Sequence, residues 1–425
     1  MPRRPSRRTH GGGPWTCWLV TSCPGCRTSP ETETHVPTRP TLEHSARALA
    51  GRARGRVSQY TGIGTRQIAR RPPTWLPSPE LAKGDPRLGL RDRWYLLGTS
   101  SLVSEEPVAT RLLGEDLVLW RDGSDAPRLM GDLCPHRGAR LSIGDVVDGE
   151  LRCSYHHWRF DGDGQCISVP SQGGTCSLAE RTRVSVSYPV VEQAGYLWAW
   201  IGEAEPAPLD LPTEFSDSRY STFPETVEWG ANWLLALENL VDLMHAPFLH
   251  AHSITLNEGI TDDRVVVDDH DDGFEIRRRD QAGTNFDWID IHTGALSYVR
   301  LDIPLPPSAG PGPPLRILGF LTPRDNAATL VHFPRFREVA GRERRIWRAL
   351  YQLRLRGTHL HVLNQDKEML ESLRTVEEAR RDEHLAQADR PVVHLRRALE
   401  PDLEAQRERF GLAPESAQAP VALAD

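Results

Sequence analysis

Two short cysteine–histidine pairs constrain the fold of this chain more than any other feature. Cys134-Pro-His136 is followed, after 16 intervening residues, by Cys153-Ser-Tyr-His156. Thiolates and imidazoles are metal ligands, and the proline in the first pair suits a tight loop. Two loops that each offer one thiolate and one imidazole can close on a single centre. The fold must therefore bring two separate loops face to face.

The sequence around these pairs predicts short β-strands. Strand-type runs lie at 94–97, 117–120 and 196–201, with Asp-Gly turn signals between them. This pattern is typical of a small antiparallel barrel or sandwich. The order C-x-H…C-x-x-H is that of a [2Fe–2S] cluster with two Cys on one iron and two His on the other. A Cys₂His₂ zinc site is the chemical alternative.

A further histidine, His157, adjoins His156. Only one of the two can occupy the second position of the C-x-x-H pattern. We therefore assign the ligand to His156 and not to His157.

A second candidate metal site lies further along the chain. Residues 231–250 have apolar positions at helical spacing, so we expect one helix there. Glu238, Asp242 and His245 are spaced i, i+4 and i+7, which would place them on one face of that helix.

His250 follows His245 by five residues, with Pro247 between them. We expect Pro247 to interrupt the helix and to let both rings turn toward one metal. Two His and one carboxylate on one face of Fe(II) leave coordination positions open for O₂ and substrate. A pair of ordinary helix-end histidines is the alternative interpretation.

Taken together, these motifs resemble those of the Rieske non-haem iron oxygenases. The resemblance lies in Cys134-Pro-His136-Arg-Gly, in Cys153-Ser-Tyr-His156-His-Trp and in the His245…His250 segment, and it covers about residues 90–400. More than 200 residues follow the cluster motif, so the chain is similar to the catalytic (alpha) subunit rather than to the small Rieske ferredoxins. Its layout resembles the homomeric branch of O-demethylases, pheophorbide-type oxygenases and natural-product tailoring enzymes.

The resemblance implies two cofactors, a Rieske [2Fe–2S] cluster and a mononuclear Fe(II). The cluster ligands would be Cys134, His136, Cys153 and His156. In the family the carboxylate ligand of the iron comes from a helix late in the chain. Asp366 matches that place, within a helix expected near 343–373, and Glu368 and Glu371 are the alternatives. The iron ligands are then expected to be His245, His250 and Asp366.

The resemblance also gives Asp242 a role. In the family this Asp links a Rieske histidine of one subunit to an iron-bound histidine of the next, which maps here to His156, Asp242 and His245. A carboxylate between two imidazoles would fix both tautomers and shorten the path for electrons. This link between subunits implies a homotrimer. Asn239, in the same segment, is the second candidate catalytic residue beside Asp242.

The expected fold class is α+β. An all-β Rieske domain over 91–205 would be followed by an iron domain over 215–400, which the family builds as an antiparallel sheet with helices, helix-grip-like. Strand-type runs fit that sheet at 265–267, 274–276, 315–321 and 329–333. Residues 1–90 are expected to be a disordered basic tail and 401–425 a flexible C-terminal tail. Asn285-Phe-Asp-Trp288 and Leu296 are candidates for the substrate pocket.

Composition limits the partners. The chain of 425 residues has 39% hydrophobic and 26% charged residues, and no run approaches the roughly 20 apolar residues of a membrane span. Residues 1–90 hold 15 Lys and Arg against 5 Asp and Glu, whereas the whole chain has a net charge of −7. Because no basic stripe accompanies a recognition motif, nucleic acid is not an expected partner.

The expected location is the bacterial cytoplasm. Ser6-Arg7-Arg8 has some likeness to a twin-arginine signal, but the apolar run after it is short, so export is not expected. Seven scattered cysteines do not form a disulfide framework. Cys166 and Cys176 are expected to be free thiols, although a bond between them stays an alternative.

The function implied by the resemblance is that of a terminal oxygenase, with a monooxygenase favoured over a dioxygenase. It would take electrons from a separate ferredoxin or flavin reductase, because no flavin- or nicotinamide-binding motif is evident. With O₂ it would hydroxylate, demethylate or oxidatively cyclise a small organic molecule. The alternatives are a ring-hydroxylating dioxygenase alpha subunit, a Rieske electron carrier without oxygenase activity, and a zinc-binding module.

Overall fold

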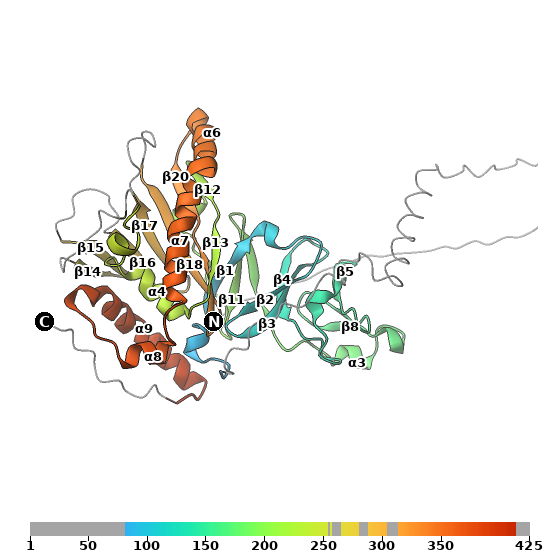
Figure 1. Cartoon of the computed structure of the whole chain (residues 1–425). Helices are drawn as coiled ribbons and strands as arrows, with labels where there is room; N and C mark the ends of the chain where they lie inside the picture. The colour runs from blue at the N-terminus through green and yellow to red at the C-terminus, as the bar shows by residue number, and fades with distance from the viewer. Residues whose placement is uncertain (1–80, 254–255, 257–264, 280–287, 304–312, 414–425) are drawn as a thin grey trace, which may run out of the picture. The chain divides into compact units, whose positions relative to one another are not determined.

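The structure is a computed structural model that describes residues 81–253, 256, 265–279, 288–303 and 313–413 (Figure 1). All of these belong to one compact unit, Arg66–Asp425. The motif Ser6-Arg7-Arg8 and most of the predicted pocket segment, Asn285 to Asp287, lie outside the described residues.

The cluster-binding half consists of short antiparallel strands, as the sequence predicts. One sheet has three strands in the order β1-β11-β10, and two sheets have four, in the orders β2-β3-β4-β9 and β5-β6-β7-β8. The strands are β1 Arg93–Thr99, β2 Val108–Leu112, β3 Glu115–Arg121, β4 Pro127–Gly131, β5 Asp145–Val147, β6 Glu150–Arg152, β7 Arg159–Phe160, β8 Cys166–Ser168, β9 Ser187–Tyr188, β10 Val190–Gln193 and β11 Tyr196–Ile201. Four short helices accompany them: 3₁₀ turns at Ser100–Leu102, Leu141–Ile143 and Pro170–Gln172, and α3 at Ser177–Glu180.

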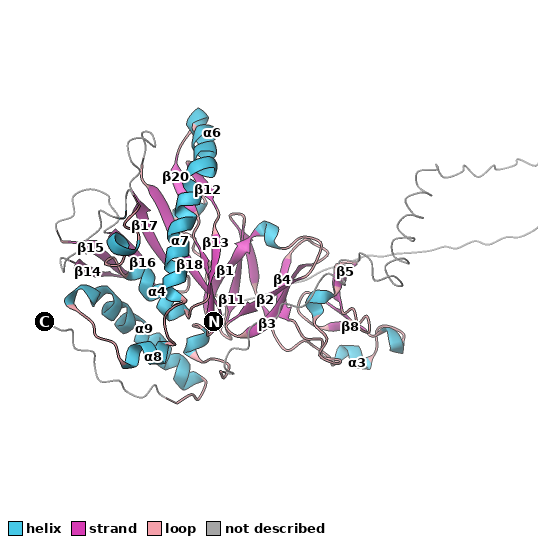
Figure 2. Cartoon of the chain, in the orientation of Figure 1, coloured by secondary structure: helices cyan, strands magenta, loops and turns pink. Residues whose placement is uncertain are grey.

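The second half is one large antiparallel sheet with helices (Figure 2). Its order is β12-β20-β18-β17-β16-β15-β14, and β19 pairs with both β18 and β13. The strands are β12 Tyr220–Phe223, β13 Thr226–Trp229, β14 Val265–His270, β15 Gly273–Arg278, β16 Trp288–His292, β17 Tyr298–Ile303, β18 Leu315–Asp325, β19 Ala328–His332 and β20 Arg335–Glu338. Three of the four predicted strand segments of this half lie within them, and the fourth, 329–333, extends one residue beyond β19.

The helices of this half are α4 Trp233–Val241, α5 Ala246–Leu249, α6 Gly341–Leu350, α7 Arg356–Leu370, α8 Val376–Arg381 and α9 Arg390–Arg409. A π-helical turn at Tyr351–Leu355 joins α6 to α7, where one helix was expected. Helix α4 packs on β18, on α7 and on α9, and α9 also packs on β14. Among the described helices, none is both long and apolar enough to cross a membrane.

The prediction of a single helix over 231–250 is wrong in one respect, because the chain forms two helices, α4 and α5. Asn232 caps the first, its side-chain oxygen accepting the amide of Leu234 at 2.9 Å. Asp242 ends it and accepts the amide of Met244 at 2.7 Å, a side-chain turn that competes with continued helix. The break therefore precedes Pro247. This proline lies in the first turn of α5, where its missing N–H removes no hydrogen bond within the helix.

Because α4 ends at Val241, Glu238 does not share a face with His245 as predicted. Its buried carboxylate instead binds Arg396 of α9 at 2.8 Å and Arg380 of α8 at 2.9 Å. Burial alone would raise the pKa of Glu238, but these two guanidinium groups lower it. Glu238 therefore stabilises helix packing and is not part of a metal site.

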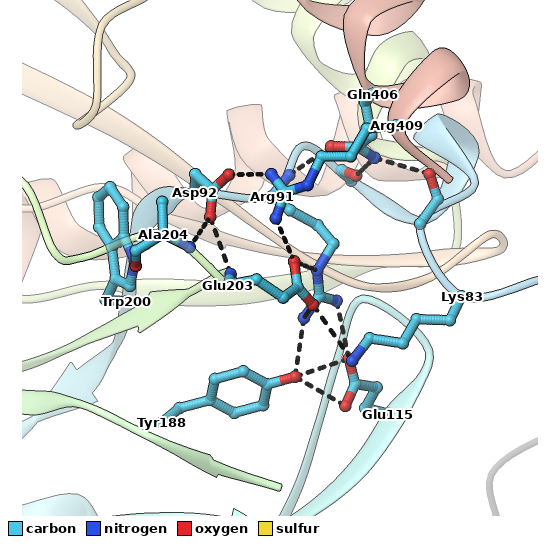
Figure 3. A network of polar contacts seen from close by, with 12 residues as sticks. Lys83, Arg91, Asp92, Glu115, Tyr188, Trp200, Glu203, Ala204, Gln406 and Arg409 are labelled. Carbon is cyan, nitrogen blue, oxygen red and sulfur yellow. Dashed lines mark hydrogen bonds and ion pairs between the residues drawn. The ribbon is translucent and has the colours of Figure 1, made fainter. Parts of the chain in front are cut away.

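The predicted tail boundaries at both ends are also wrong. Residues 81–90 contain a 3₁₀ turn, Pro86–Leu88, in which Leu88 is buried, and α9 extends to Arg409 with Leu403 buried. The two segments meet at Gln406, which accepts the amide of Arg91 at 2.6 Å and donates to the carbonyls of Gly84 and Gly89 at 2.9 Å (Figure 3).

Arg91 extends this network into the cluster-binding half. Its side chain is buried and reaches Glu115 of β3 at 2.7 Å and the hydroxyl of Tyr188 at 2.8 Å. Arg409 pairs with Asp92 beside it. A second connection is apolar, since Trp198 and Trp200 of β11 share a buried cluster with Phe320 of β18. The two halves are therefore joined by both polar and apolar contacts.

Candidate metal centres and active-site cavity

The two cysteine–histidine loops have matching backbones. In the first, which follows β4, the amide of Gly138 donates to the carbonyl of Cys134 at 2.9 Å. In the second, between β6 and β7, the amide of His157 donates to the carbonyl of Cys153 at 2.9 Å. Gly138 and His157 both have a left-handed backbone, with φ of 69° and 59°.

His157 is thus the counterpart of Gly138, the residue that closes the turn, which gives it a structural role. This agrees with the assignment of the second imidazole to His156.

The four predicted cluster residues come together at the tips of these loops. Cys134 and Cys153 are buried, at 2% exposure each, whereas His136 and His156 are exposed. The two imidazole rings lie 4.4 Å apart between centroids, and Trp158 stacks on His136 at 4.4 Å. The arrangement places two sulfurs on an inner side and two imidazoles on an outer side.

The two thiols are hydrogen bonded to each other, with Cys134 donating. This lowers the pKa of Cys153 to about 6 and raises that of Cys134. Backbone amides of His136 and Tyr155, among others, also point at the sulfurs and favour thiolates. Amide hydrogen bonds to the sulfurs are one of the features that set the potential of an iron–sulfur cluster.

Among the described residues, two groups of at least three His, Cys, Asp or Glu have ligand atoms that all lie within 4.8 Å of one another, and neither contains Cys134 or His136. Two buried thiols beside two exposed imidazoles match the ligand set of a [2Fe–2S] cluster in which two Cys hold one iron and two His hold the other.

The first of those groups is His245, His250 and Asp366, the predicted mononuclear iron ligands. His245 precedes α5, His250 follows it, and Asp366 lies in α7. The Nε2 atoms of the two histidines lie 3.4 and 3.2 Å from Oδ1 of Asp366. That oxygen is buried and has no hydrogen-bond partner within the chain, as expected of a metal ligand.

The alternative carboxylates do not join this group. Glu368 is exposed, and Glu371 accepts the amide of Gly230 at 2.9 Å. Both lie on other parts of α7 or beyond its end.

Each histidine of the group has a second residue beside its Nδ1 atom. For His245 this is an ion-pair contact, with Oδ2 of Asp242 3.4 Å from Nδ1, and not a hydrogen bond. Nδ1 of His250 lies 3.1 Å from Oε1 of Gln365, whose Nε2 donates to the carbonyl of Leu249 at 2.9 Å. These contacts leave both Nε2 atoms directed at the metal position. The sequence indicated Asp242 but gave no sign of Gln365.

The carboxylates in this group favour a positive charge between them and the histidines. Burial favours a neutral His245, but the carboxylates of Asp242 and Asp366 outweigh it and raise the pKa of His245 to about 9. Burial likewise raises the pKa of Asp366, yet its contacts with His245 and His250 bring the net shift below the usual value. A divalent cation would take the place of the proton that these opposite charges attract.

A cavity of about 210 Å³ opens onto these ligands. Asn239 and Asp242 line it together with His245, His250 and Asp366. Most of its other wall residues are apolar: Leu240, Leu256, Ile289, Leu301, Ile303, Ile317, Phe333, Leu355, Val362 and Leu363. An apolar cavity with a few convergent polar groups is typical of a small-molecule site.

The two described residues of the predicted pocket, Trp288 and Leu296, do not line this cavity. Leu296 forms a β-bridge with Trp94 of β1, so it contributes to the contact between the two halves.

The second ligand-like group, His270, Asp290 and His292, differs from the first. Its members are partly exposed, and Asp290 accepts from both rings at 3.0 and 3.2 Å. The amide of Asp272 lies 3.3 Å from Nδ1 of His270, which favours the tautomer protonated at Nε2. This group is therefore a hydrogen-bonded cluster. The described cysteines outside the cluster loops, Cys166 and Cys176, are free.

Two family models match the chain. Residues 93–184 match the Rieske [2Fe-2S] domain, and residues 229–405 match the vanillate O-demethylase oxygenase C-terminal domain. The first contains all four cluster residues and the second contains His245, His250 and Asp366. The [2Fe–2S] cluster and the mononuclear iron are the cofactors of these two domains.

Curated relatives include the 3-chlorobenzoate-3,4-dioxygenase oxygenase subunit of Comamonas testosteroni, 35% identical over 200 residues, which are 45% of this chain and 43% of that protein. The dicamba O-demethylase oxygenase component of Stenotrophomonas maltophilia is 34% identical over 164 residues, 38% of this chain and 48% of that protein. The chain therefore spans less than half the length of these relatives.

Solved structures support the fold. Dicamba monooxygenase bound to dicamba has a TM-score of 0.58 at 24% identity, over 75% of this chain and 99% of the other. The oxygenase of carbazole 1,9a-dioxygenase has a TM-score of 0.62 at 21% identity, over 78% and 96%. With a Rieske domain followed by an oxygenase domain of the vanillate O-demethylase type, the chain belongs to the Rieske non-haem iron oxygenases.

Proposed function

We propose that the chain is a terminal oxygenase that uses O₂ and electrons from a separate ferredoxin or flavin reductase to oxidise a small aromatic molecule. The observation that carries this proposal is the convergence of His245, His250 and Asp366 at the wall of an apolar cavity, in a chain that also holds a Rieske ligand set. When bound, the cluster supplies electrons and the iron activates O₂.

In this proposal the residues around the iron have distinct tasks. His245, His250 and Asp366 hold the metal, and Asp242 and Gln365 fix the histidine tautomers. The apolar walls bind the substrate and exclude water, which strengthens the electrostatic interactions at the site. Asn239 lies at the same cavity wall and is proposed to contact substrate or O₂.

We propose that electrons pass between subunits of a homotrimer, from His156 of one chain through Asp242 to His245 of the next. The exposed ring of His156 and the partly exposed carboxylate of Asp242 support this, since each is accessible to a neighbour. Tyr155 beside the cluster is 55% exposed and Phe248 beside the iron ligands is 68% exposed. Exposed aromatic residues of this kind are typical of protein interfaces.

A monooxygenase is proposed over a dioxygenase, on the match of residues 229–405 to the vanillate O-demethylase oxygenase C-terminal domain. The relatives also include dioxygenases, so product analysis with ¹⁸O₂ has to decide. Two labelled oxygens in the organic product support the dioxygenase. One labelled oxygen supports a hydroxylating monooxygenase, and an unlabelled phenol with release of formaldehyde supports an O-demethylating monooxygenase. We also place the protein in a reducing cytoplasm, in agreement with free Cys166 and Cys176.

The first experiment is to measure iron and acid-labile sulfide per chain on protein purified without O₂. About three irons and about two sulfides are expected from one cluster and one mononuclear site. About two irons that do not rise on addition of Fe(II) would identify an electron carrier, and zinc without sulfide would overturn both metal assignments. Substrate screening with a surrogate reductase then tests turnover.

A further inference from the structure

One wall residue of the cavity stands apart from the apolar majority. Arg335, in β20, is 2% exposed and lines the same cavity as the iron ligands. Its cross-strand neighbours are Ile317 of β18 and Phe223 of β12. A buried guanidinium normally has a carboxylate and further hydrogen bonds to itself, because burying an unpaired charge is costly.

Arg335 shares its nearest carboxylate with a second arginine. The nearest one, Glu225, lies 4.0 Å from Nη1 of Arg335 and is held by Arg356 through two contacts of 2.8 and 3.1 Å. Two guanidinium groups thus share one carboxylate, and the closer pair is Arg356 with Glu225. The interior is left with an excess positive charge at Arg335.

The remaining contacts of Arg335 are neutral. Its Nη1 reaches the carbonyl of Phe333 at 3.5 Å, and its guanidinium is hydrogen bonded to the hydroxyl of Tyr351. His359 lies close by, at 3.3 Å from that hydroxyl, and burial together with Arg335 lowers the pKa of His359 to about 3, so this ring is neutral. Nε of Arg335 is buried and has no hydrogen-bond partner.

Helix α7 relates this group to the iron ligands. The wall residues His359, Val362 or Leu363, and Asp366 recur at helical spacing along one side of α7. Seven residues separate His359 from Asp366, which corresponds to about 10 Å along the helix axis. A substrate held near His359 and Arg335 would therefore need an apolar body of roughly one or two rings to reach the iron.

We propose that Arg335 binds the carboxylate of an aromatic acid and so determines the specificity of the cavity. This deepens the proposed function and rests on it for the reaction, although the anion site itself can be tested by binding alone. A planar guanidinium with a free Nε matches a carboxylate with two parallel hydrogen bonds. The bound acid would supply the counter-charge that Arg335 lacks within the chain.

The test compares an acid with its uncharged ester on iron-loaded holoprotein, by calorimetric titration of 3-methoxybenzoate and methyl 3-methoxybenzoate. Wild-type protein is expected to prefer the acid. In Arg335→Gln the acid should bind about tenfold more weakly or worse, because a buried charge pair is lost, and the ester should bind as in wild type. Arg335→Lys should restore part of the preference.

A surface variant keeps the test valid if Arg335→Gln does not fold. Arg356 has a half-exposed side chain, and Arg356→Gln frees Glu225 to pair with Arg335, so acid binding should weaken while ester binding does not. The matched control is Arg354→Gln, which removes the same charge from an exposed position in the preceding turn and should change neither.

Three results would overturn the anion site: equal binding of acid and ester by wild type, equal loss of both in Arg335→Gln, or unchanged acid binding in Arg356→Gln. Turnover and metal content are measured on the same samples. A protein that prefers the acid but has no mononuclear iron or no turnover supports the anion site and overturns the oxygenase proposal, so the two failures are distinguishable.

Discussion

Gln365 offers a direct test of how the iron ligands are held. It is the contact of His250 on the side of the ring away from Asp366, with Oε1 at 3.1 Å from Nδ1, and its amide anchors the end of α5 through Leu249. In Gln365→Leu the ring of His250 loses the contact that fixes its tautomer. Loss of such a supporting contact lowers metal affinity by about 10- to 100-fold, which corresponds to about 1.4–2.7 kcal/mol.

The assay is a competition titration of Fe(II) against a chelator on protein from which the mononuclear iron has been removed. The visible spectrum of the cluster serves as the internal reference for intact protein. Asn364→Ala is the control, since Asn364 is the exposed neighbour on α7. If Gln365→Leu bound Fe(II) as tightly as wild type with the cluster intact, Gln365 would not be a positioning residue.

Four further outcomes are expected. Asp366→Ala should retain the red-brown cluster and lose turnover and mononuclear iron; full activity would contradict its role as a ligand. Asp242→Ala should retain both metals but slow the oxidation of the cluster in a single turnover, and rapid oxidation would refute the bridge. His157→Gly should retain the cluster absorbance, because the left-handed φ of 59° suits glycine. Glu238→Gln should destabilise the protein by about 1.5–3 kcal/mol, because Arg396 and Arg380 lose a charged hydrogen-bond partner while Glu383 still pairs with Arg396. Folding lowers the pKa of Glu238. The stabilisation by its carboxylate is therefore present above the ordinary pKa of 4.5 and is lost as the pH falls below that value. Urea unfolding curves of wild type and variant should accordingly converge in acid.

The candidate metal ligands could be proposed from the sequence because each motif is local. Cys134, His136, Cys153 and His156 are specified by spacing within two short loops, and His245 and His250 lie within one segment. The strands also follow from local runs of β-type residues. Asp366 required the resemblance, because a single carboxylate 116 residues after His250 has no pattern of its own.

The contacts that the sequence did not predict join distant segments through single polar side chains. Gln406 hydrogen bonds with residues more than 300 positions earlier and so joins the C-terminal helix α9 to the first described residues of the chain. Gln365 supports His250 in the same way across 115 residues. The break at Asp242 was missed for a different reason: apolar spacing supports a continuous helix, but the carboxylate of Asp242 satisfies the amide of Met244 and so competes with the next turn. The same carboxylate contacts His245 through its other oxygen. The residue that ends α4 is thus also in contact with His245, which couples the local turn to the position of that candidate ligand.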